Sequence, residues 1–231
     1  MDNAAAPAQN PSESSADAGS PEESDALSLS SLISSRVCHD LINPVGAIGS
    51  GLDVLDDPDT EETMRDAALD LIRSGAQKAL ALLTFARLAY GAAGGFGAQI
   101  SLDDAKAAMQ AVYDTLKPEL AWNLAGGLAA KEQVKTLLIL AHAAADCVPR
   151  GGVVAIEGEI GDFTITATGK RIYLQDDLVK ALQGDGRGLT PKFTPALIAA
   201  QLVKSAGGEI SAEATDEKAV MRARVKAHNQ A

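Results

Sequence analysis

Apolar residues recur every three or four positions along residues 38–55, and this spacing constrains the fold more than any other feature. The first series comprises Cys38, Leu41, Val45, Ile48, Leu52 and Leu55. A second series comprises Ala68, Leu71, Gly75, Ala79, Leu82, Ala86 and Ala89. Side chains at this spacing lie along one side of an α-helix and need a partner to cover them. We therefore predict a helical hairpin over residues 27–91 that pairs with a second copy as a four-helix bundle dimer.

Proline, glycine and acidic residues predict where the hairpin begins, turns and ends. The first helix is expected to end near Asp56 and Asp57, and Pro58 suits the first turn of the second helix. Glycines at 91, 94, 95 and 97 predict a flexible linker after it. Residues 1–25 have no apolar periodicity and are predicted to be a disordered tail. The hairpin domain is thus assigned to residues 26–92.

The remaining residues, 98–228, alternate between short β-like runs and helical runs. The β-like runs are 119–124, 153–160, 163–169, 209–215 and 218–225, and the helical runs are 103–116, 131–148 and 194–206. Gly161-Asp162 separates the second run from the third and indicates a β-hairpin. We predict an α/β sandwich with helices on one face of a mixed sheet, which makes the whole chain α+β.

Composition argues against several classes of function. A formal net charge of −11 lacks the basic surface that nucleic acid or an anionic membrane would require. No apolar run reaches the ~18 residues of a membrane span and no signal peptide is evident, so we expect a cytoplasmic protein. His39, His142 and His228 are too far apart in sequence to suggest a metal site. Cys38 and Cys147 are expected to be reduced core residues.

The segment best suited to take part in a reaction is Arg36-Val37-Cys38-His39-Asp40-Leu41-Ile42-Asn43-Pro44. A helix turns about 100° per residue, which places His39 roughly 150° from the centre of the apolar series and therefore on the solvent side. Asp40 can accept a hydrogen bond from one imidazole nitrogen, or remove its proton, and leave the other nitrogen as a nucleophile. Pro44 interrupts the helical hydrogen bonding one turn later. Such a break beside an exposed histidine indicates a site, although Pro44 could instead only shape the bundle.

The same helical wheel predicts a docking surface for a partner beside His39. Its residues are small or polar where an exposed helix usually carries long charged side chains. Asn43, Gly46, Ser50, Asp53 and Asp57 share the His39 face, and Ile42 and Gly49 flank it. With Arg36, all of these except Asp57 are the predicted partner-binding residues. Alternatively, Gly46 and Gly49 permit close packing inside the bundle.

The run from His39 to Pro44 resembles the H-box of sensor histidine kinases, which implies that His39 accepts a phosphoryl group and Asp40 assists it. The second domain departs from the kinase pattern. Its helical run from residue 131 has no Asn, and Thr168-Gly169-Lys170-Arg171 stands where kinases carry Asp-x-Gly-x-Gly. Residues 184–189 look like a shortened nucleotide lid or simply a turn, whereas residues 194–210 resemble the last helix and strand of a kinase domain. We therefore predict no binding of ATP.

This combination resembles the ChpT-type histidine phosphotransferases of alphaproteobacteria. The resemblance implies a homodimer that relays phosphate through His39, from the receiver domain of a hybrid kinase to downstream response regulators of the cell cycle. It implies no cofactor of its own, with Mg²⁺ only on the partner receiver domain. Arg36, Asn43 and Pro44 fit the surrounding box. Two alternatives stay open: an active kinase with divergent nucleotide motifs, and a regulator-binding dimer in which His39 is incidental.

Overall fold

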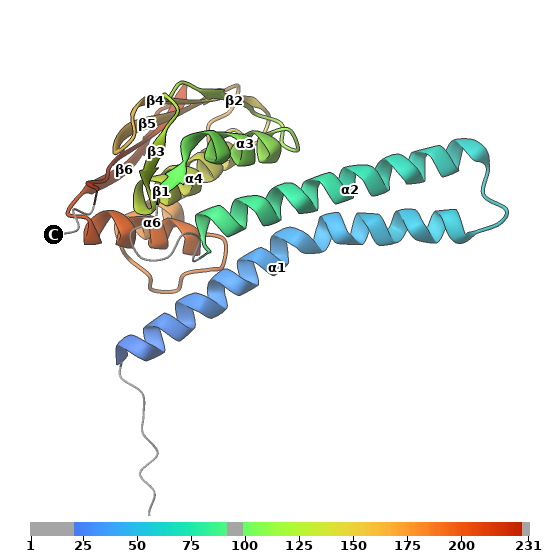
Figure 1. Cartoon of the computed structure of the whole chain (residues 1–231), viewed down its shortest axis with the longest axis horizontal. Helices are drawn as coiled ribbons and strands as arrows, with labels where there is room; N and C mark the ends of the chain where they lie inside the picture. Colours follow the sequence, from blue (N-terminus) through green and yellow to red (C-terminus); the bar gives the residue numbers. More distant parts are fainter. Residues whose placement is uncertain (1–20, 92–98, 228–231) are drawn as a thin grey trace, which may run out of the picture.

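Two long helices form an arm that projects from an α/β domain in the computed structural model, which describes residues 21–91 and 99–227 (Figure 1). Helix α1 spans Pro21–Asp56 and α2 spans Glu62–Ala89, so the predicted helical hairpin is confirmed. Helix α1 begins earlier than predicted, and the expected disorder of residues 21–25 is wrong because the fixed φ of Pro21 suits the first turn of a helix. The other residues of the predicted tail, and most of the predicted linker, lie outside the described residues.

The turn between the helices differs from the prediction, because Pro58 lies in the connection and not in the first turn of α2. The Asp57 carboxylate accepts a hydrogen bond from the Asp59 amide at 3.0 Å. The Thr60 hydroxyl donates to the Val54 carbonyl at 2.9 Å, and this bond occupies a carbonyl that the end of α1 leaves free. These local bonds make residues 57–61 a closing turn and delay the start of α2.

Helix α1 carries two neighbouring apolar rows where the sequence suggested one. Pro44, Ile48 and Gly51 pack against Ala68, Ile72 and Gly75 of α2, and Leu41 and Leu55 continue this row half-buried. A second row is exposed and consists of Cys38, Ile42, Val45, Gly49 and Leu52. The predicted series drew members from both rows because consecutive residues lie only about 100° apart on a helix. The expectation that Cys38 is a core residue is therefore wrong, whereas Cys147 is buried and both thiols are free.

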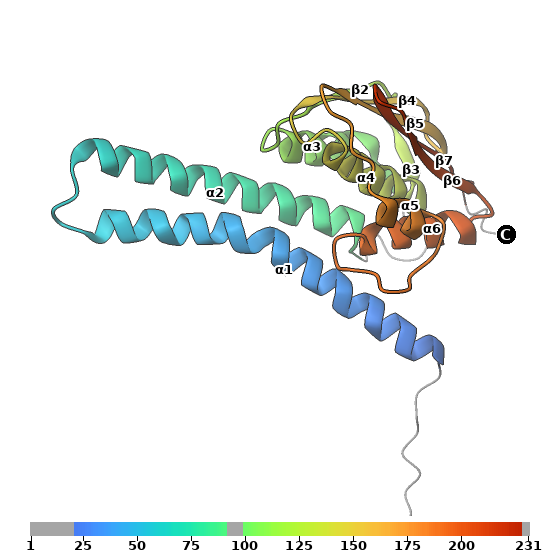
Figure 2. The ribbon, with the colours of Figure 1, turned by 180° about the vertical axis from the view of Figure 1, so that it is seen from behind.

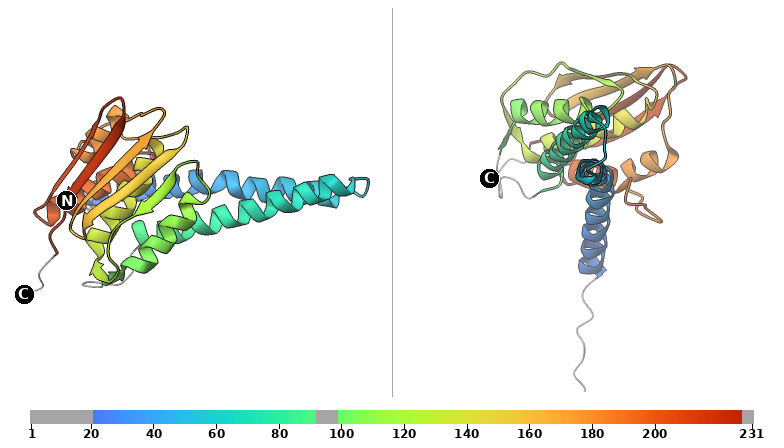
Figure 3. Two further views of the ribbon diagram at one scale, coloured as in Figure 1. Left: turned by 90° about the horizontal axis from the view of Figure 1, so that it is seen from above. Right: turned by 90° about the vertical axis from the view of Figure 1, so that its right-hand side faces the viewer.

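The α/β domain is built from a five-stranded mixed sheet with helices on one face. Its helices are α3 (Leu102–Tyr113), α4 (Lys131–Asp146), α5 (Asp176–Leu182) and α6 (Thr194–Ser205). The sheet strands are β2 (Glu119–Trp122), β4 (Gly152–Glu159), β5 (Asp162–Gly169), β6 (Glu209–Ala214) and β7 (Lys218–Arg224). They lie in the order β2-β4-β5-β7-β6, with β2 parallel to β4 and the other pairs antiparallel. Figure 3 shows the strands as one layer with the helices behind it, which confirms the predicted sandwich.

Three short elements were missing from the prediction. Helix α5 has 7 residues, too few to display an apolar period. Strands β1 (Gln99–Ser101) and β3 (Leu128–Ala130) form a separate two-stranded sheet of 3 residues each. The predicted β-hairpin is confirmed: Glu159 pairs with Asp162, and Gly161 turns the chain with a φ of +93°.

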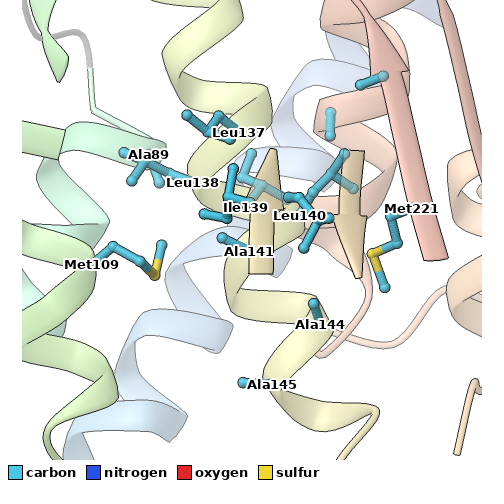
Figure 4. Close-up of a cluster of buried hydrophobic side chains, with 14 of the residues drawn as sticks. Ala89, Met109, Leu137, Leu138, Ile139, Leu140, Ala141, Ala144, Ala145 and Met221 are labelled. Atoms are coloured by element: carbon cyan, nitrogen blue, oxygen red, sulfur yellow. The ribbon is translucent and has the colours of Figure 1, made fainter. Parts of the chain in front are cut away.

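One hydrophobic core joins the base of the arm to the sheet. In Figure 4, Ala89 of α2 and Met109 of α3 lie on one side of α4 and Met221 of β7 on the other. Leu137, Leu138 and Leu140 of α4 are buried in the middle of this cluster. The Lys135 ammonium also donates to the carbonyl of Gly91 at 2.6 Å, just after α2. The arm is thus anchored to the α/β domain by a shared core. Among the helices of the described residues, none combines the length and apolarity needed to cross a membrane.

Candidate functional site

His39 stands on the outer side of α1, as the helical wheel predicts. Its side chain is 77% exposed, and Nδ1 lies 3.4 Å from Oδ1 of Asp40. That separation is at the outer limit of a hydrogen bond. Because the adjacent carboxylate faces Nδ1, the nitrogen available to a partner is Nε2. An exposed imidazole with one nitrogen oriented by an acid is suited to nucleophilic attack by the other.

Asp40 is more enclosed than His39, because Arg36 lies over it one turn earlier in α1. Arg36 Nε donates to Oδ2 of Asp40 at 2.7 Å, and the two side chains are 12% and 20% exposed. A terminal guanidinium nitrogen of Arg36 donates to the carbonyl of Lys192 at 3.0 Å. The structure therefore brings Arg36, Asp40 and His39 together, but it places Arg36, a predicted partner-binding residue, mostly inside the protein.

The predicted docking surface is fully accessible in this chain. Asn43, Gly46, Ser50, Asp53 and Asp57 are exposed, as are Ile42 and Gly49. A Cβ added at Gly46 or Gly49 would meet no atom within 4 Å, so neither glycine serves packing within the hairpin. Close approach occurs at Gly75 and at Gly51, and only Gly75 stood out in the sequence. Gly51 follows Pro44 and Ile48 at helical spacing, a signal that the row facing α2 would have supplied.

Aromatic side chains line the inner side of this site, where the arm meets α4. The Phe85 ring of α2 lies 4.8 Å from the His142 ring of α4 and meets the Tyr90 ring edge-on at 5.6 Å. Burial, and next the positive charge of Arg36, lower the pKa of His142, which is therefore neutral at pH 7. His142 is thus an interface residue and differs from the exposed His39.

A small cavity lies beside α4, where residues of α5 and α6 border it. The cavity there has a volume of about 30 Å³ and is bordered by Ile139, His142, Leu178, Phe193 and Ala196. Ligand pockets for molecules of drug size are ~300 Å³ or larger. A larger hollow of about 740 Å³ is an open groove between α2 and α3 whose lining includes no residue of α1. Among the described residues, no group of three or more His, Cys, Asp and Glu side chains is placed to hold a metal ion.

Comparisons with known proteins agree on one family. The family described as histidine phosphotransferase C-terminal domain matches residues 102–218. The protein phosphotransferase ChpT of Brucella abortus (strain 2308) is 36% identical over 209 residues, which cover 86% of this chain and 96% of the relative. A solved bacterial phosphotransferase superposes with a TM-score of 0.76 at 34% identity and covers 86% of this chain and 97% of that one. The histidine kinase AdeS of Acinetobacter baumannii is more distant, with a TM-score of 0.41 and 13% identity. The protein belongs to the family of ChpT-type histidine phosphotransferases, and its function is phosphoryl transfer.

Proposed function

We propose that His39 is the residue that carries the phosphoryl group between receiver domains of a two-component pathway. The observation that carries the proposal is the exposed His39 ring, whose Nδ1 faces Asp40 while Nε2 is free to meet a partner. The donor is the receiver domain of a hybrid kinase, and the acceptors are downstream response regulators. By its family resemblance, the relay operates in the cytoplasm and controls the cell cycle.

The transfer needs only groups that His39, Asp40 and a receiver supply. The Nε2 lone pair attacks phosphorus, the bond from phosphorus to the receiver's aspartate oxygen breaks, and the carboxylate leaves with the electron pair. The ring keeps its Nδ1 proton and becomes positively charged, and Asp40 offsets that charge. A second receiver reverses the step when its aspartate attacks phosphorus and the N–P bond breaks. Mg²⁺ belongs to the receivers and is not required on this chain.

The proposed relay is a dimer joined through the hairpin. Ile42, Val45 and Leu52 of α1 are exposed in one row, and Met64, Leu71, Leu80 and Leu83 of α2 are also exposed. Exposed apolar patches of this extent are unusual on monomers. A second hairpin packed on them would complete a four-helix bundle. Ile42 and Gly49 belong to this row and lie at its edge nearest to His39. They therefore border both the proposed dimer contact and the receiver-binding surface.

Receivers are proposed to dock beside His39 on Asn43, Gly46, Ser50 and Asp53. These residues are exposed and offer no bulky side chain. A receiver must bring its aspartyl phosphate into line with Nε2, so its surface needs to approach α1 closely. The small residues allow that approach over about four helical turns from His39.

Labelled phosphate tests the assignment of His39. A receiver domain is phosphorylated with radiolabelled acetyl phosphate and incubated with the full chain, and acid-labile label on this protein is followed. Wild type should gain label and pass it to a second receiver, whereas His39→Gln should gain none. His142→Gln is the matched control, because that histidine is enclosed at the interface with Phe85. Label retained by His39→Gln would overturn the proposal, and label taken directly from ATP would favour the kinase alternative.

A further inference from the structure

The ion pair between Arg36 and Asp40 differs in its surroundings from the Arg73–Asp70 pair on α2. Arg73 and Asp70 of α2 are 2.9 Å apart, a comparable separation, but their side chains are 65% and 79% exposed. Arg36 and Asp40 are only 12% and 20% exposed. Exposed pairs contribute little because water and salt screen them, and enclosure strengthens the attraction. The Arg36–Asp40 pair therefore fixes the carboxylate more firmly than a surface pair does.

Buried aromatic groups enclose the pair on the side of α2. Burial raises the pKa of the Tyr90 hydroxyl far above the usual range. Tyr90 is also close enough to the ion pair that Arg36 lowers this pKa and Asp40 raises it. Its Oη is a buried atom without a hydrogen-bond partner among the described residues. Phe85 is buried and packs between Tyr90 and His142. The carboxylate of Asp40 is thus held by Arg36 through Oδ2 and faces His39 with Oδ1.

The other anchor of Arg36 comes from the α/β domain. The carbonyl of Lys192 that accepts from Arg36 lies 156 positions later in the chain, in the segment before α6 that runs beside α1 (Figure 2). That segment is itself held in place. Lys192 Nζ donates to Oε1 of Gln175 at 3.2 Å and lies 3.7 Å from Oδ2 of Asp146, and the next residue, Phe193, is buried. The acceptor offered to Arg36 is thus fixed relative to α4.

We propose that Arg36 is a positioning residue through which the α/β domain orients the acid beside the phosphoacceptor. Lys192 holds Arg36, Arg36 holds Oδ2 of Asp40, and Oδ1 is left facing Nδ1 of His39. The segment before α6 thereby serves as a support for the phosphotransfer site. The inference rests on the proposed role of His39 and adds to it a function for the α/β domain.

Single-turnover kinetics separate this role from contact with a receiver. The full chain is mixed with increasing amounts of a receiver domain phosphorylated by radiolabelled acetyl phosphate, and the maximal rate and half-saturating concentration are measured. Arg36→Gln should lower the maximal rate about 10- to 100-fold, since misplacing a reacting group has effects of this order, and leave the half-saturating concentration within about twofold. Arg36→Lys keeps the charge but cannot span both acceptors, so its maximal rate should lie between those of wild type and Arg36→Gln. Arg73→Gln, from the exposed pair, should transfer at the wild-type rate.

A double-mutant cycle with Asp40→Asn supplies the decisive comparison. If Arg36 acts through Asp40, adding Arg36→Gln to Asp40→Asn should change the maximal rate by less than about twofold. Multiplicative losses would overturn the inference, as would a raised half-saturating concentration at an unchanged maximal rate, which would assign Arg36 to receiver binding. Should Arg36→Gln fail to fold by circular dichroism, Arg36→Lys in the same cycle decides between the outcomes. A failure of His39 as acceptor is recognised separately, because His39→Gln would then keep its label.

Discussion

Gly75 of α2 packs directly on the backbone of Pro44 in α1. A Cβ at Gly75 would lie 2.7 Å from the Pro44 carbonyl oxygen and 3.0 Å from Cγ1 of Ile48, so Gly75→Ala must push the helices apart. We expect it to lower the free energy of unfolding by about 1–3 kcal/mol despite the better helix propensity of alanine. Urea unfolding at fixed protein concentration measures this. Gly46→Ala, which meets no atom within 4 Å, is the control and should raise it by up to about 1 kcal/mol.

The exposed row of α1 predicts how the dimer can be broken. Val45→Glu combined with Leu52→Glu should produce helical monomers by light scattering, because each buried apolar side chain is worth about 1.5–3 kcal/mol. Ile48 is unsuitable for this test, since it packs on Gly75 within the chain. Val153→Glu, at an exposed apolar position on the sheet, is the control and should remain dimeric. A monomeric wild type would contradict the bundle.

Bulk beside His39 should block receivers without disturbing the fold. Ser50→Trp or Gly46→Leu is expected to raise the half-saturating concentration of a phosphorylated receiver by about 10-fold, or roughly 1.4 kcal/mol of binding free energy. The substituted side chains point into open space, so circular dichroism and light scattering should match wild type. Ser211→Trp, on the exposed edge strand β6, introduces the same bulk elsewhere and should transfer normally. Wild-type kinetics for Ser50→Trp would mean that receivers dock on another face.

Nucleotide should not bind to the α/β domain. The cavity of about 30 Å³ between α4 and α6 holds roughly one water molecule, and Phe193 borders it. Calorimetric titration of the full chain with ATP and Mg²⁺ should give no heat of binding. A micromolar dissociation constant would instead revive the kinase alternative.

Acid should weaken the attachment of the arm through His142. Burial, and next Arg36, lower its pKa from the ordinary value of 6.5, while Asp146 and Asp40 act in the opposite direction. The unfolded chain therefore binds a proton that the folded chain resists, so the free energy of unfolding falls as the pH drops below about 6.5. The fall is at most about 1.4 kcal/mol per pH unit for this one group.

Unfolding at pH 7.5 and pH 5.5 measures this dependence. His142→Leu keeps the packing on Phe85 but carries no titrating group, so its unfolding free energy should change less between the two pH values than that of wild type. His39→Gln, which removes an exposed histidine, is the control. Equal slopes for wild type and His142→Leu would contradict the assignment.

Regular periodicity made most of the fold predictable from the sequence. Strands β4 and β5 bury alternate residues such as Val154, Ile156 and Ile165, and the turn between them needs the positive φ of Gly161. The exposure of His39 also followed from the helical wheel alone. Helix α5 was missed because 7 residues give no period, and Pro58 misled because a proline suits both a turn and a first helical turn.

The surroundings of the site were beyond sequence reasoning. Arginine is usually a surface residue, and only the fold brings Arg36 to the carbonyl of Lys192, 156 positions away. The two rows of α1 could not be separated either, since Leu41 and Ile42 are both apolar and only α2 decides which of them is covered. Contacts between distant segments, and not local pattern, assign these residues their roles.

The number of residues in helix α1 fixes the face on which each of its side chains lies. Three rows run along it: one packed on α2 through Ile48, one apolar and exposed through Val45, and one beside His39 through Ser50. Inserting a single residue after Gly46 would rotate every later side chain by about 100°. Leu52 would then enter the row beside His39, and Ser50 would turn toward α2. A single substitution leaves the three rows in place, but the length of the helix between His39 and the turn can change only in steps of about two whole turns.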